Sequence, residues 1–150
     1  MNMRIRKFKK GDARVVSNII RRCLREVNSR DYSKKAITNL CNFFTPSLMI
    51  RNLKDRIILV AVENNKVVGT ASLKKDIVFT VFVNLDIHRK GIGSKLMDKI
   101  EDLARKQGCR TIKVPSALTS FEFYKKRGYK KIKIVHSEDD GDTIEMKKSL

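Results

Sequence analysis

A run of basic and glycine residues between positions 88 and 95 carries the most specific chemistry in this sequence. It reads His88-Arg89-Lys90-Gly91-Ile92-Gly93-Ser94-Lys95, and it joins a run of β-branched and aromatic residues to a helical pattern. Glycines at a strand-to-helix corner let the backbone approach a ligand closely, and the first N–H groups of a helix have no partner within the helix. Such a corner binds phosphate, and neighbouring Arg and Lys side chains add charge. The run therefore predicts a site for a phosphate-bearing ligand.

Two familiar phosphate-binding loops do not fit this corner. A Walker A loop ends in Gly-Lys-Ser/Thr, whereas Gly93 is followed by Ser94 and Lys95 in the reverse order. A dinucleotide-binding loop requires a third glycine where this chain has Leu96. The two glycines by themselves also fit an ordinary tight turn. The ligand therefore has to be identified from the elements around the corner.

Hydrophobic periodicity predicts the elements that hold this corner in place. Before it, the pattern predicts a strand at 3–8, a helix over 12–27 capped by Asp12, a second helix capped by Ser33, and a meander over 56–63, 66–74 and 77–85. After it, the pattern predicts a helix over 91–106, a strand over 111–114, a helix over 118–127, and strands over 129–136 and 143–148. Asn64-Asn65 suits the turn of the first hairpin, and 43–53 is either a loop or a short helix.

The order of these elements is β-α-α-β-β-β-α-β-α-β-β. It predicts an α/β fold of the α+β type, with one mixed, mostly antiparallel sheet and helices on both of its faces. The chain contains no internal repeat and no Pro/Gly/Ser-rich linker. We therefore expect a single domain over residues 1–150.

The composition excludes several classes of protein. No apolar run approaches the roughly 20 residues of a membrane span, and the basic start lacks the apolar stretch of a secretory signal, so we expect a cytoplasmic protein. Three cysteines without a C-x-x-C pair exclude a disulfide framework and a zinc ribbon. We expect Cys23, Cys41 and Cys109 to be small core residues. Two histidines are too few for a transition-metal site, so no metal is expected.

The chain is strongly basic, with 34 Lys and Arg against 16 Asp and Glu, a net charge of +18. Such a surplus attracts anions from nucleic acid to phosphorylated cofactors and does not by itself say which. Four arginines, Arg14, Arg21, Arg22 and Arg25, share one face of the first predicted helix and would suit phosphate contacts. Trp is absent and no nucleic-acid-binding module is recognisable, so nucleic acid is a possible partner but not the favoured one.

A second run, Phe123-Tyr124-Lys125-Lys126-Arg127-Gly128-Tyr129, supplies the missing context. Together with the run from His88 to Lys95 and the order of the elements, it resembles the GNAT superfamily of acyl-CoA-dependent N-acyltransferases. The resemblance is specific from about Val78 to Tyr129 and only topological before Arg56. In that family the pattern Q/R-x-x-G-x-G/A holds the coenzyme A pyrophosphate on main-chain amides. The exposed edge of the fourth strand bonds the pantetheine arm as an added strand.

The resemblance implies acetyl-CoA as the co-substrate, without a metal. It places the pyrophosphate on the amides of Arg89, Lys90, Gly91, Ile92, Gly93 and Ser94, and the pantetheine arm along Val81, Phe82 and Val83. His88 stands where the family has Gln or Arg, and Ala117 stands where many members carry an Asn. We expect these two departures to weaken cofactor affinity without loss of the fold.

Tyr124 is the residue that the resemblance marks as the acid for the departing thiolate, because a phenol is a proton donor at pH 7. It could also be a packing residue whose hydroxyl is hydrogen-bonded. A protonated amine acceptor further requires a general base. The candidates for this base are Asp76, Asp86, Glu63, Glu26 and Asp31.

These observations predict an acetyl-CoA-dependent N-acetyltransferase in which an acceptor primary amine attacks the thioester directly. The alternative is a non-catalytic protein on the same fold that senses acyl-CoA or associates with nucleic acid. Basic N-terminal helices would repel polycations, while the turn with Glu138, Asp139, Asp140 and Asp142 would attract them. We expect a peptide or protein N-terminus, or an amino-acid-like small molecule, as acceptor. The length of the acyl chain and the oligomeric state stay open.

Overall fold

The computed structural model of the chain describes residues 3–87 and 91–150. The first part contains β1 (Met3–Lys7), α1 (Ala13–Glu26), α2 (Lys34–Phe43), α3 (Pro46–Asn52), β2 (Ile57–Glu63), β3 (Lys66–Lys74) and β4 (Ile77–Val83). The second part contains α4 (Ile92–Lys106), β5 (Thr111–Ser116), α5 (Phe121–Lys126), β6 (Lys130–Val135) and β7 (Thr143–Ser149). None of the helices in these two ranges is long and apolar enough to cross a membrane.

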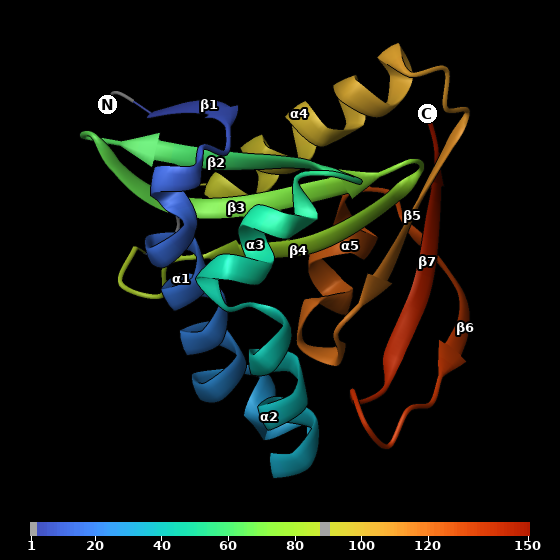
Figure 1. Ribbon diagram of the computed structural model, residues 1–150. Coiled ribbons are helices and arrows are strands. Elements are labelled where there is room, and N and C mark those ends of the chain that lie inside the picture. The colour runs from blue at the N-terminus through green and yellow to red at the C-terminus, as the bar shows by residue number, and fades with distance from the viewer. Residues whose placement is uncertain (1–2, 88–90) are drawn as a thin grey trace.

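The strands of the described residues form one sheet in the order β1-β2-β3-β4-β5-β7-β6 (Figure 1). Neighbouring strands are antiparallel except β4 and β5, which run parallel. Helices α1, α2 and α3 pack on one face of the sheet, and α4 and α5 pack on the opposite face. The predicted mixed, mostly antiparallel sheet with helices on both faces is confirmed.

The sheet splits between β4 and β5. These two strands pair at one position, Ile77 with Lys113, and the Lys113 N–H donates a hydrogen bond to the Asp76 carbonyl at 2.8 Å. Past this point β4 continues to Val83 and β5 to Ser116 without further pairing between them in the described residues. The edge of β4 that faces β5 therefore has backbone groups with no strand partner.

Local signals explain two of the element boundaries as predicted. Asn64 and Asn65 have φ angles of 51° and 63°, the left-handed pair expected in the hairpin turn between β2 and β3. The Ser33 hydroxyl accepts a hydrogen bond from the Ala36 N–H at 3.1 Å and caps α2. In both places a short polar side chain decides where a regular element stops or starts.

Two segments are better defined in the structure than in the sequence pattern. The stretch 43–53 contains the short helix α3, which begins at Pro46 after a cap by the Thr45 hydroxyl. The helix predicted over 118–127 divides into a 3-10 turn, Leu118–Ser120, and α5. The order of elements therefore gains one helix relative to the prediction.

Asp12 occupies the N-cap position of α1 as predicted, but its side chain does not make the expected capping hydrogen bond to this helix. Its carboxylate instead accepts two hydrogen bonds from the Arg6 guanidinium, at 2.8 and 3.0 Å, and one from the Lys9 N–H at 2.8 Å. A bidentate guanidinium is a stronger partner for a carboxylate than a helix N–H. The hydrogen bond from Arg6 lowers the pKa of Asp12. Asp12 therefore ties β1 to the turn before α1.

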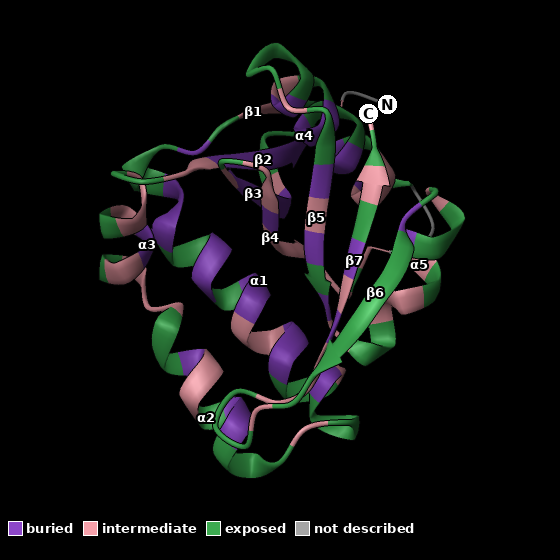
Figure 2. Cartoon of the chain, turned by 90° about the vertical axis from the view of Figure 1, so that its right-hand side faces the viewer, coloured by how far each residue is buried: buried purple, intermediate pink, exposed green. Residues whose placement is uncertain are grey.

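Burial is uneven across the sheet. Strands β2 and β3 are buried along most of their length because helices cover both of their faces, whereas β6 is exposed throughout (Figure 2). Strands β5 and β7 alternate between buried and more exposed positions, as expected where one face is packed and the other open. The β5-β7-β6 end of the sheet thus has one open face.

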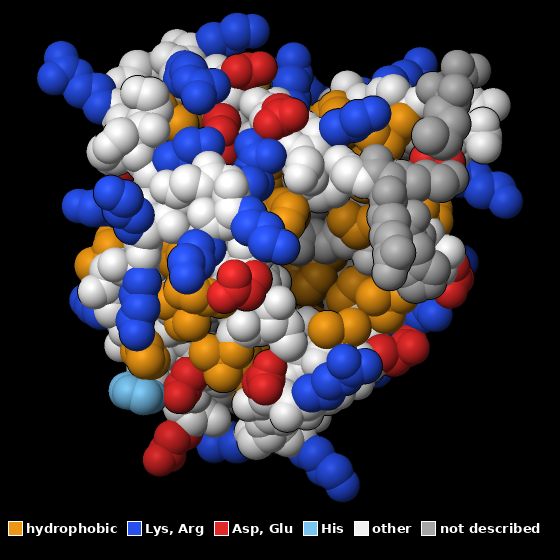
Figure 3. Space-filling model, turned by 180° about the vertical axis from the view of Figure 1, so that it is seen from behind, with side chains coloured by type: hydrophobic (Ala, Val, Ile, Leu, Met, Phe, Trp, Pro, Cys, Tyr) orange, Lys and Arg blue, Asp and Glu red, His pale blue; other side chains and the backbone are white. Residues whose placement is uncertain are grey.

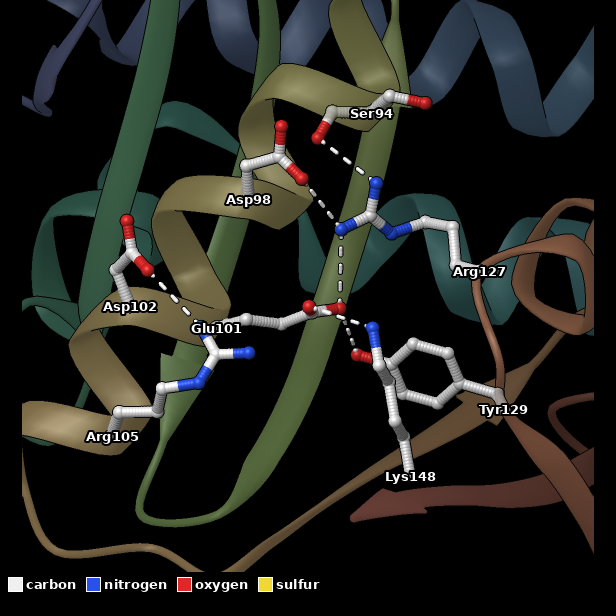
Figure 4. A network of polar contacts seen from close by, with 8 residues as sticks. All are labelled: Ser94, Asp98, Glu101, Asp102, Arg105, Arg127, Tyr129 and Lys148. Carbon is white, nitrogen blue, oxygen red and sulfur yellow. Dashed lines mark hydrogen bonds and ion pairs between the residues drawn. The ribbon is translucent and has the colours of Figure 1, made fainter. Parts of the chain in front are cut away.

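A buried carboxylate joins α4 to the C-terminal part of the chain (Figure 4). Glu101 in α4 is 3% exposed; it accepts hydrogen bonds from the Tyr129 hydroxyl at 2.8 Å and the Lys148 ammonium at 2.9 Å, and it lies 3.2 Å from the Arg127 guanidinium. Burial opposes ionisation, but the hydrogen bonds from Lys148 and Tyr129 and the charge of Arg127 keep the pKa of Glu101 below its ordinary value. Glu101 is therefore an ionised link between α4, β7 and the turn that joins α5 to β6.

Arg127 extends this network to the start of α4. Its guanidinium donates to the Ser94 carbonyl at 3.3 Å and to the Asp98 carboxylate at 2.8 Å (Figure 4). Ser94 belongs to the first turn of α4, and Arg127 directly follows α5. The network consequently fixes where α5 lies relative to the beginning of α4.

Replacing Glu101 with Gln should lower the free energy of unfolding by about 3 kcal/mol, because the buried centre of the network would lose its charge and two partly buried cations, Lys148 and Arg127, would lose a shared anion. Asp102→Asn is the matched control, since Asp102 pairs with Arg105 on the surface at side-chain exposures of 59% and 48%. This control should cost about 0.5 kcal/mol or less. Urea unfolding at pH 7 measures both values. Equal losses would contradict a stabilising role for the buried network.

The same carboxylate predicts a dependence of stability on acid. The folded-state pKa of Glu101 is lowered, so its contribution is complete above the unfolded-state pKa of about 4.3 and disappears as the pH falls through the folded-state pKa. Between pH 6 and pH 3 the wild-type protein should lose more unfolding free energy than Glu101→Gln. Identical pH profiles for the two proteins would argue against this assignment.

Candidate active site

A cavity of about 150 Å³ lies where β4 and β5 diverge. From the α1–α3 side it is lined by Leu24, Asn28, Tyr32, Leu40 and Phe44, from the strands by 78–82 and 114–117, and otherwise by Ser120, Tyr124, Asp140 and Thr143. Apolar walls with a few polar groups are typical of small-molecule sites. The split in the sheet thus creates space for a ligand between the two groups of helices.

A second hollow lies at the start of α4. It is lined by Val83, Ile87, Gly91, Ile92, Gly93, Ser94 and Phe123. Gly91 is left-handed at φ 65°, and its carbonyl accepts the first helical hydrogen bond from the Lys95 N–H at 3.0 Å. The N–H groups of 92–94 therefore have no partner within the helix. A Cβ on Gly93 would lie 3.3 Å from the Phe123 ring, so the corner has little room for a larger residue.

The cavity and the hollow are lined by residues that are direct neighbours in the sequence. Phe82 and Tyr124 line the cavity, while their neighbours Val83 and Phe123 line the hollow. Figure 3 shows a hydrophobic depression on this side of the molecule. His88, Arg89 and Lys90, which were predicted for the pyrophosphate, lie outside the described residues.

Strand β4 is distorted where it lines the cavity. Thr80 has a φ of 50°, which is rare for a β-branched residue, and the register with β3 shifts there so that 80–81 bulge. The Ser72 hydroxyl holds the bulge, donating to the Phe79 carbonyl at 3.1 Å and lying 2.8 Å from the Thr80 hydroxyl. The predicted pantetheine edge, Val81 to Val83, therefore starts at a bulge that takes 80–81 out of the β3 ladder.

Tyr124 projects from α5 into the wall of this cavity and is 4% exposed. Its ring packs edge-to-face against Phe123 and Tyr129, at centroid distances of 5.1 and 5.5 Å. Burial raises the pKa of Tyr124, although the charge of Arg127 opposes this effect. Its hydroxyl makes no hydrogen bond to any residue that the structure describes. Unlike Tyr129, whose hydroxyl is occupied by Glu101, Tyr124 has a hydroxyl available for a ligand.

Cys23 of α1, which contacts the end of β4, is unsuited to covalent chemistry. The Cys23 thiol donates to the Val83 carbonyl at 3.3 Å, and burial raises its pKa to about 11. A thiol with such a pKa is not a thiolate at neutral pH. Cys23 and Cys41 are buried as predicted for core residues, whereas Cys109 is only partly buried.

The five predicted general-base candidates are absent from the described lining of the cavity. Glu26 and Asp86 both bind Arg22, at 2.7 and 2.9 Å. Glu63 ends β2, Asp76 precedes β4, and Asp31 is exposed after α1. Glu26 and Asp86 thus lie close to each other through Arg22, but the structure does not bring the five carboxylates together at one site.

A carboxylate outside these five candidates, Asp140, does line the cavity. It belongs to the turn between β6 and β7, which crosses to α2. There the Asp139 carboxylate pairs with Lys35 at 2.8 Å, and the Tyr32 hydroxyl donates to the Asp142 carbonyl at 2.8 Å. The only available signal in the sequence was the cluster of four carboxylates around Gly141.

The comparison with protein families agrees with this geometry. A family model described as an acetyltransferase (GNAT) domain matches residues 28–150. The chain belongs to the GNAT acetyltransferase family. Its members use acetyl-CoA as the acetyl donor, so the resemblance expected from the two sequence runs is confirmed. A comparison with curated proteins found no match.

Solved structures show the same GNAT architecture. A GCN5-related N-acetyltransferase from Rhodopseudomonas palustris is 26% identical, with a TM-score of 0.89 over 100% of this chain and 99% of that one. PaiA N-acetyltransferase from Thermoplasma acidophilum, solved with coenzyme A, is 20% identical, with a TM-score of 0.81 over 100% of both chains. The putative acetyltransferase YncA from Salmonella typhimurium, solved with acetyl-CoA, is 21% identical, with a TM-score of 0.71 over 100% of this chain and 95% of that one.

The GNAT corner at the start of α4 can be tested by cofactor binding. Acetyl-CoA at about 100 times its Kd should raise Tm by about 5 °C or more, and Gly93→Asp should abolish this shift, because a carboxylate would crowd Phe123 and repel phosphate. Gly11→Asp is the control, since a Cβ there meets nothing within 4 Å. Thermal unfolding with and without acetyl-CoA measures the effect. An undiminished shift in Gly93→Asp would place the cofactor elsewhere.

Proposed function

We propose that this chain, acting as one unit over 1–150, transfers the acetyl group of acetyl-CoA to a primary amine by direct attack. One observation carries the proposal: within the described residues, an edge of β4 without a strand partner and the Tyr124 hydroxyl without a hydrogen bond line the same cavity, next to N–H groups that have no partner within α4. An extended amide chain can pair with the strand edge. The start of α4 suits the phosphates of coenzyme A.

The described residues fit acetyl-CoA. The amides of 91–94 would hold the pyrophosphate, and the absence of a side chain at Gly93 keeps this corner open against Phe123. Val81, Phe82 and Val83 would bond the pantetheine arm. We assign His88, Arg89 and Lys90 to the pyrophosphate side of the site from the sequence alone.

The chemistry requires that the amine lose a proton and that the negative charge developing on sulfur be stabilised. The acceptor nitrogen forms a bond to the thioester carbonyl carbon as the carbon–sulfur bond breaks, and the amine loses a proton. We assign that proton to Asp140, the carboxylate in the described cavity lining. The coenzyme A sulfur leaves as a thiolate and accepts a hydrogen bond from the Tyr124 hydroxyl. Most of the rate enhancement then comes from holding the two reactants together.

Tyr124 acts chiefly as a hydrogen-bond donor during this step. A thiol has a pKa of about 8.5, whereas burial raises the pKa of Tyr124 above its ordinary value. Complete transfer of the phenol proton is therefore uphill, but the buried hydroxyl stays protonated and stabilises charge as it develops on sulfur. The opposing effect of Arg127 on this pKa reduces the difference.

Tyr124→Phe should lower kcat by about ten- to a thousandfold with little change in the Kd for acetyl-CoA, because the lost interaction forms in the transition state. Tyr129→Phe is the matched control: it removes the same atom from a neighbouring buried ring whose hydroxyl is bonded to Glu101. This control should lower stability and leave kcat within about threefold. Steady-state release of coenzyme A with an amine panel measures both.

Unchanged turnover in Tyr124→Phe would make this tyrosine a packing residue. Thermal stabilisation by acetyl-CoA without turnover on amino acids, peptides, polyamines or aminoglycosides would favour the non-catalytic acyl-CoA-binding alternative. We propose a peptide or protein N-terminus, or an amino-acid-like molecule, as the acceptor. The pairing of Asp139 with Lys35 supports this choice, because it leaves fewer free carboxylates near the cavity to attract a polycation.

A further inference from the structure

The open face of β5, β7 and β6 is basic and uncovered. Alternation along the strands places Thr111, Lys113, Pro115, Thr143, Glu145, Lys147, Ser149, Lys130, Lys133 and Val135 on this face, which we call the lysine face. The alternate residues of β5 and β7, such as Val114 and Met146, are buried on the other side. Figure 2 looks onto this end of the sheet, where β6 is exposed along its whole length. The lysine face carries four cationic side chains and one carboxylate.

Three of these lysines stand directly opposite one another. Lys113 of β5 pairs in register with Lys147 of β7, and Lys147 pairs in register with Lys130 of β6. Strands lie about 4.8 Å apart, so the row spans roughly 10 Å. Like charges directly opposite on a sheet are destabilising. Within the described residues none of the three forms an ion pair, whereas Lys133 lies 3.8 Å from Glu145. The electrostatic repulsion among these three lysines is therefore not offset by any ion pair within the described residues.

Protection of a sheet edge does not account for this row. Lysines on an edge strand prevent unwanted pairing with other chains, and this explains Lys130 and Lys133 on the edge strand β6. Lys147 lies on β7, which is flanked by strands on both sides, and Lys113 lies on β5, next to the split. A charge placed on inner strands, without a partner, fits a ligand of opposite charge.

The lysine face suits an acidic polypeptide better than a nucleic acid. It has no aromatic side chain for base stacking and no Arg for bidentate phosphate contacts, among the residues that the structure describes. Glu145 in its middle would repel a continuous polyphosphate but would tolerate separate carboxylates beside it. Separate carboxylates on an extended peptide match separate lysines on a sheet.

The lysine face leads directly into the cavity. Pro115 and Thr143 belong to the face and also line the cavity. Lys113 is two residues before Pro115, a distance of about 7 Å along a strand. An extended peptide advances about 3.3–3.6 Å per residue. A peptide whose first residue occupies the cavity would therefore bring its third to fifth residues over the row of lysines.

We propose that the acceptor is an acidic polypeptide whose terminal amine enters the cavity while carboxylates at its third to fifth residues pair with Lys113, Lys130 and Lys147. This proposal rests on the proposed acetyltransferase function and narrows its acceptor. The lysine face contributes to recognition of the acceptor and takes no part in the acetyl transfer.

The test uses three peptides with a free N-terminus: one with Asp or Glu at positions 3–5, one with Asn or Gln there, and one with the acidic residues moved to positions 9–11. Binding is measured by fluorescence anisotropy and acetylation by kcat/KM. The first peptide should exceed the second by about three- to thirtyfold in both, and the difference should shrink with added salt. Equal values for the first two peptides, or for the first and third, would overturn the proposal.

The variant Lys130→Gln/Lys147→Gln should remove most of this preference while leaving the Tm shift with acetyl-CoA unchanged. Lys99→Gln/Lys106→Gln on α4 is the matched control, because it removes the same charge from the helix side of the sheet. Loss of the preference in both variants would show that it depends on net charge alone. That result would contradict specific recognition by the lysine face.

Two further outcomes separate this proposal from the proposed function. Acetylation of neutral and acidic peptides at equal rates would overturn the proposed role of the lysine face and would support the proposed acetyltransferase function. Charge-dependent binding of the first peptide without any acetylation, and without a Tm shift by acetyl-CoA, would contradict both the function and the peptide as acceptor. Binding of a 12-nucleotide single-stranded RNA, but not of the acidic peptide, lost in Lys130→Gln/Lys147→Gln, would assign the face to nucleic acid.

Discussion

The pairing of β4 with β5 at Ile77 and Lys113, and at no later described position, is the constraint on which the site depends. A continuous ladder would satisfy the backbone of β4 and close the sheet. The divergence instead leaves an unpaired strand edge, opens a cavity through the sheet and gives Tyr124 a space to face. The bulge at Thr80, in the same part of β4, takes further backbone out of the ladder. Backbone groups that elsewhere stabilise a sheet are here available to a ligand.

A split sheet needs other contacts between its two halves, and the Glu101 network supplies some of them. Glu101 belongs to α4, which packs on the β1–β4 half, while Lys148 and Tyr129 belong to the C-terminal half. Arg127 adds a bond to the first turn of α4 through Ser94. The same side chains therefore hold the halves together and set the position of α5. Stability and the placement of Tyr124 have a common physical origin.

The fold decides which of the charged side chains behind the net charge of +18 are paired within the protein and which are not. One arginine of α1, Arg22, is paired within the protein, because it binds both Glu26 and Asp86. Asp139 is likewise paired with Lys35. The lysine face, by contrast, holds three opposed lysines with no ion pair among the described residues. Which charges are free for a partner is decided by pairing across distant segments.

The sequence by itself determined the family, the order of nearly all elements and the glycine corner, because periodicity, turn residues such as Asn64-Asn65 and the two basic runs are local patterns. It also led to Tyr124. It could not determine that Asp12 binds Arg6 in preference to a helix end, or that Asp140 and not the five other carboxylates reaches the cavity. Those outcomes, like the burial of Glu101 and the row of lysines, depend on which segments far apart in the chain lie side by side. Only the tertiary structure sets those neighbours, because burial and pairing are properties of packed elements and not of residue types.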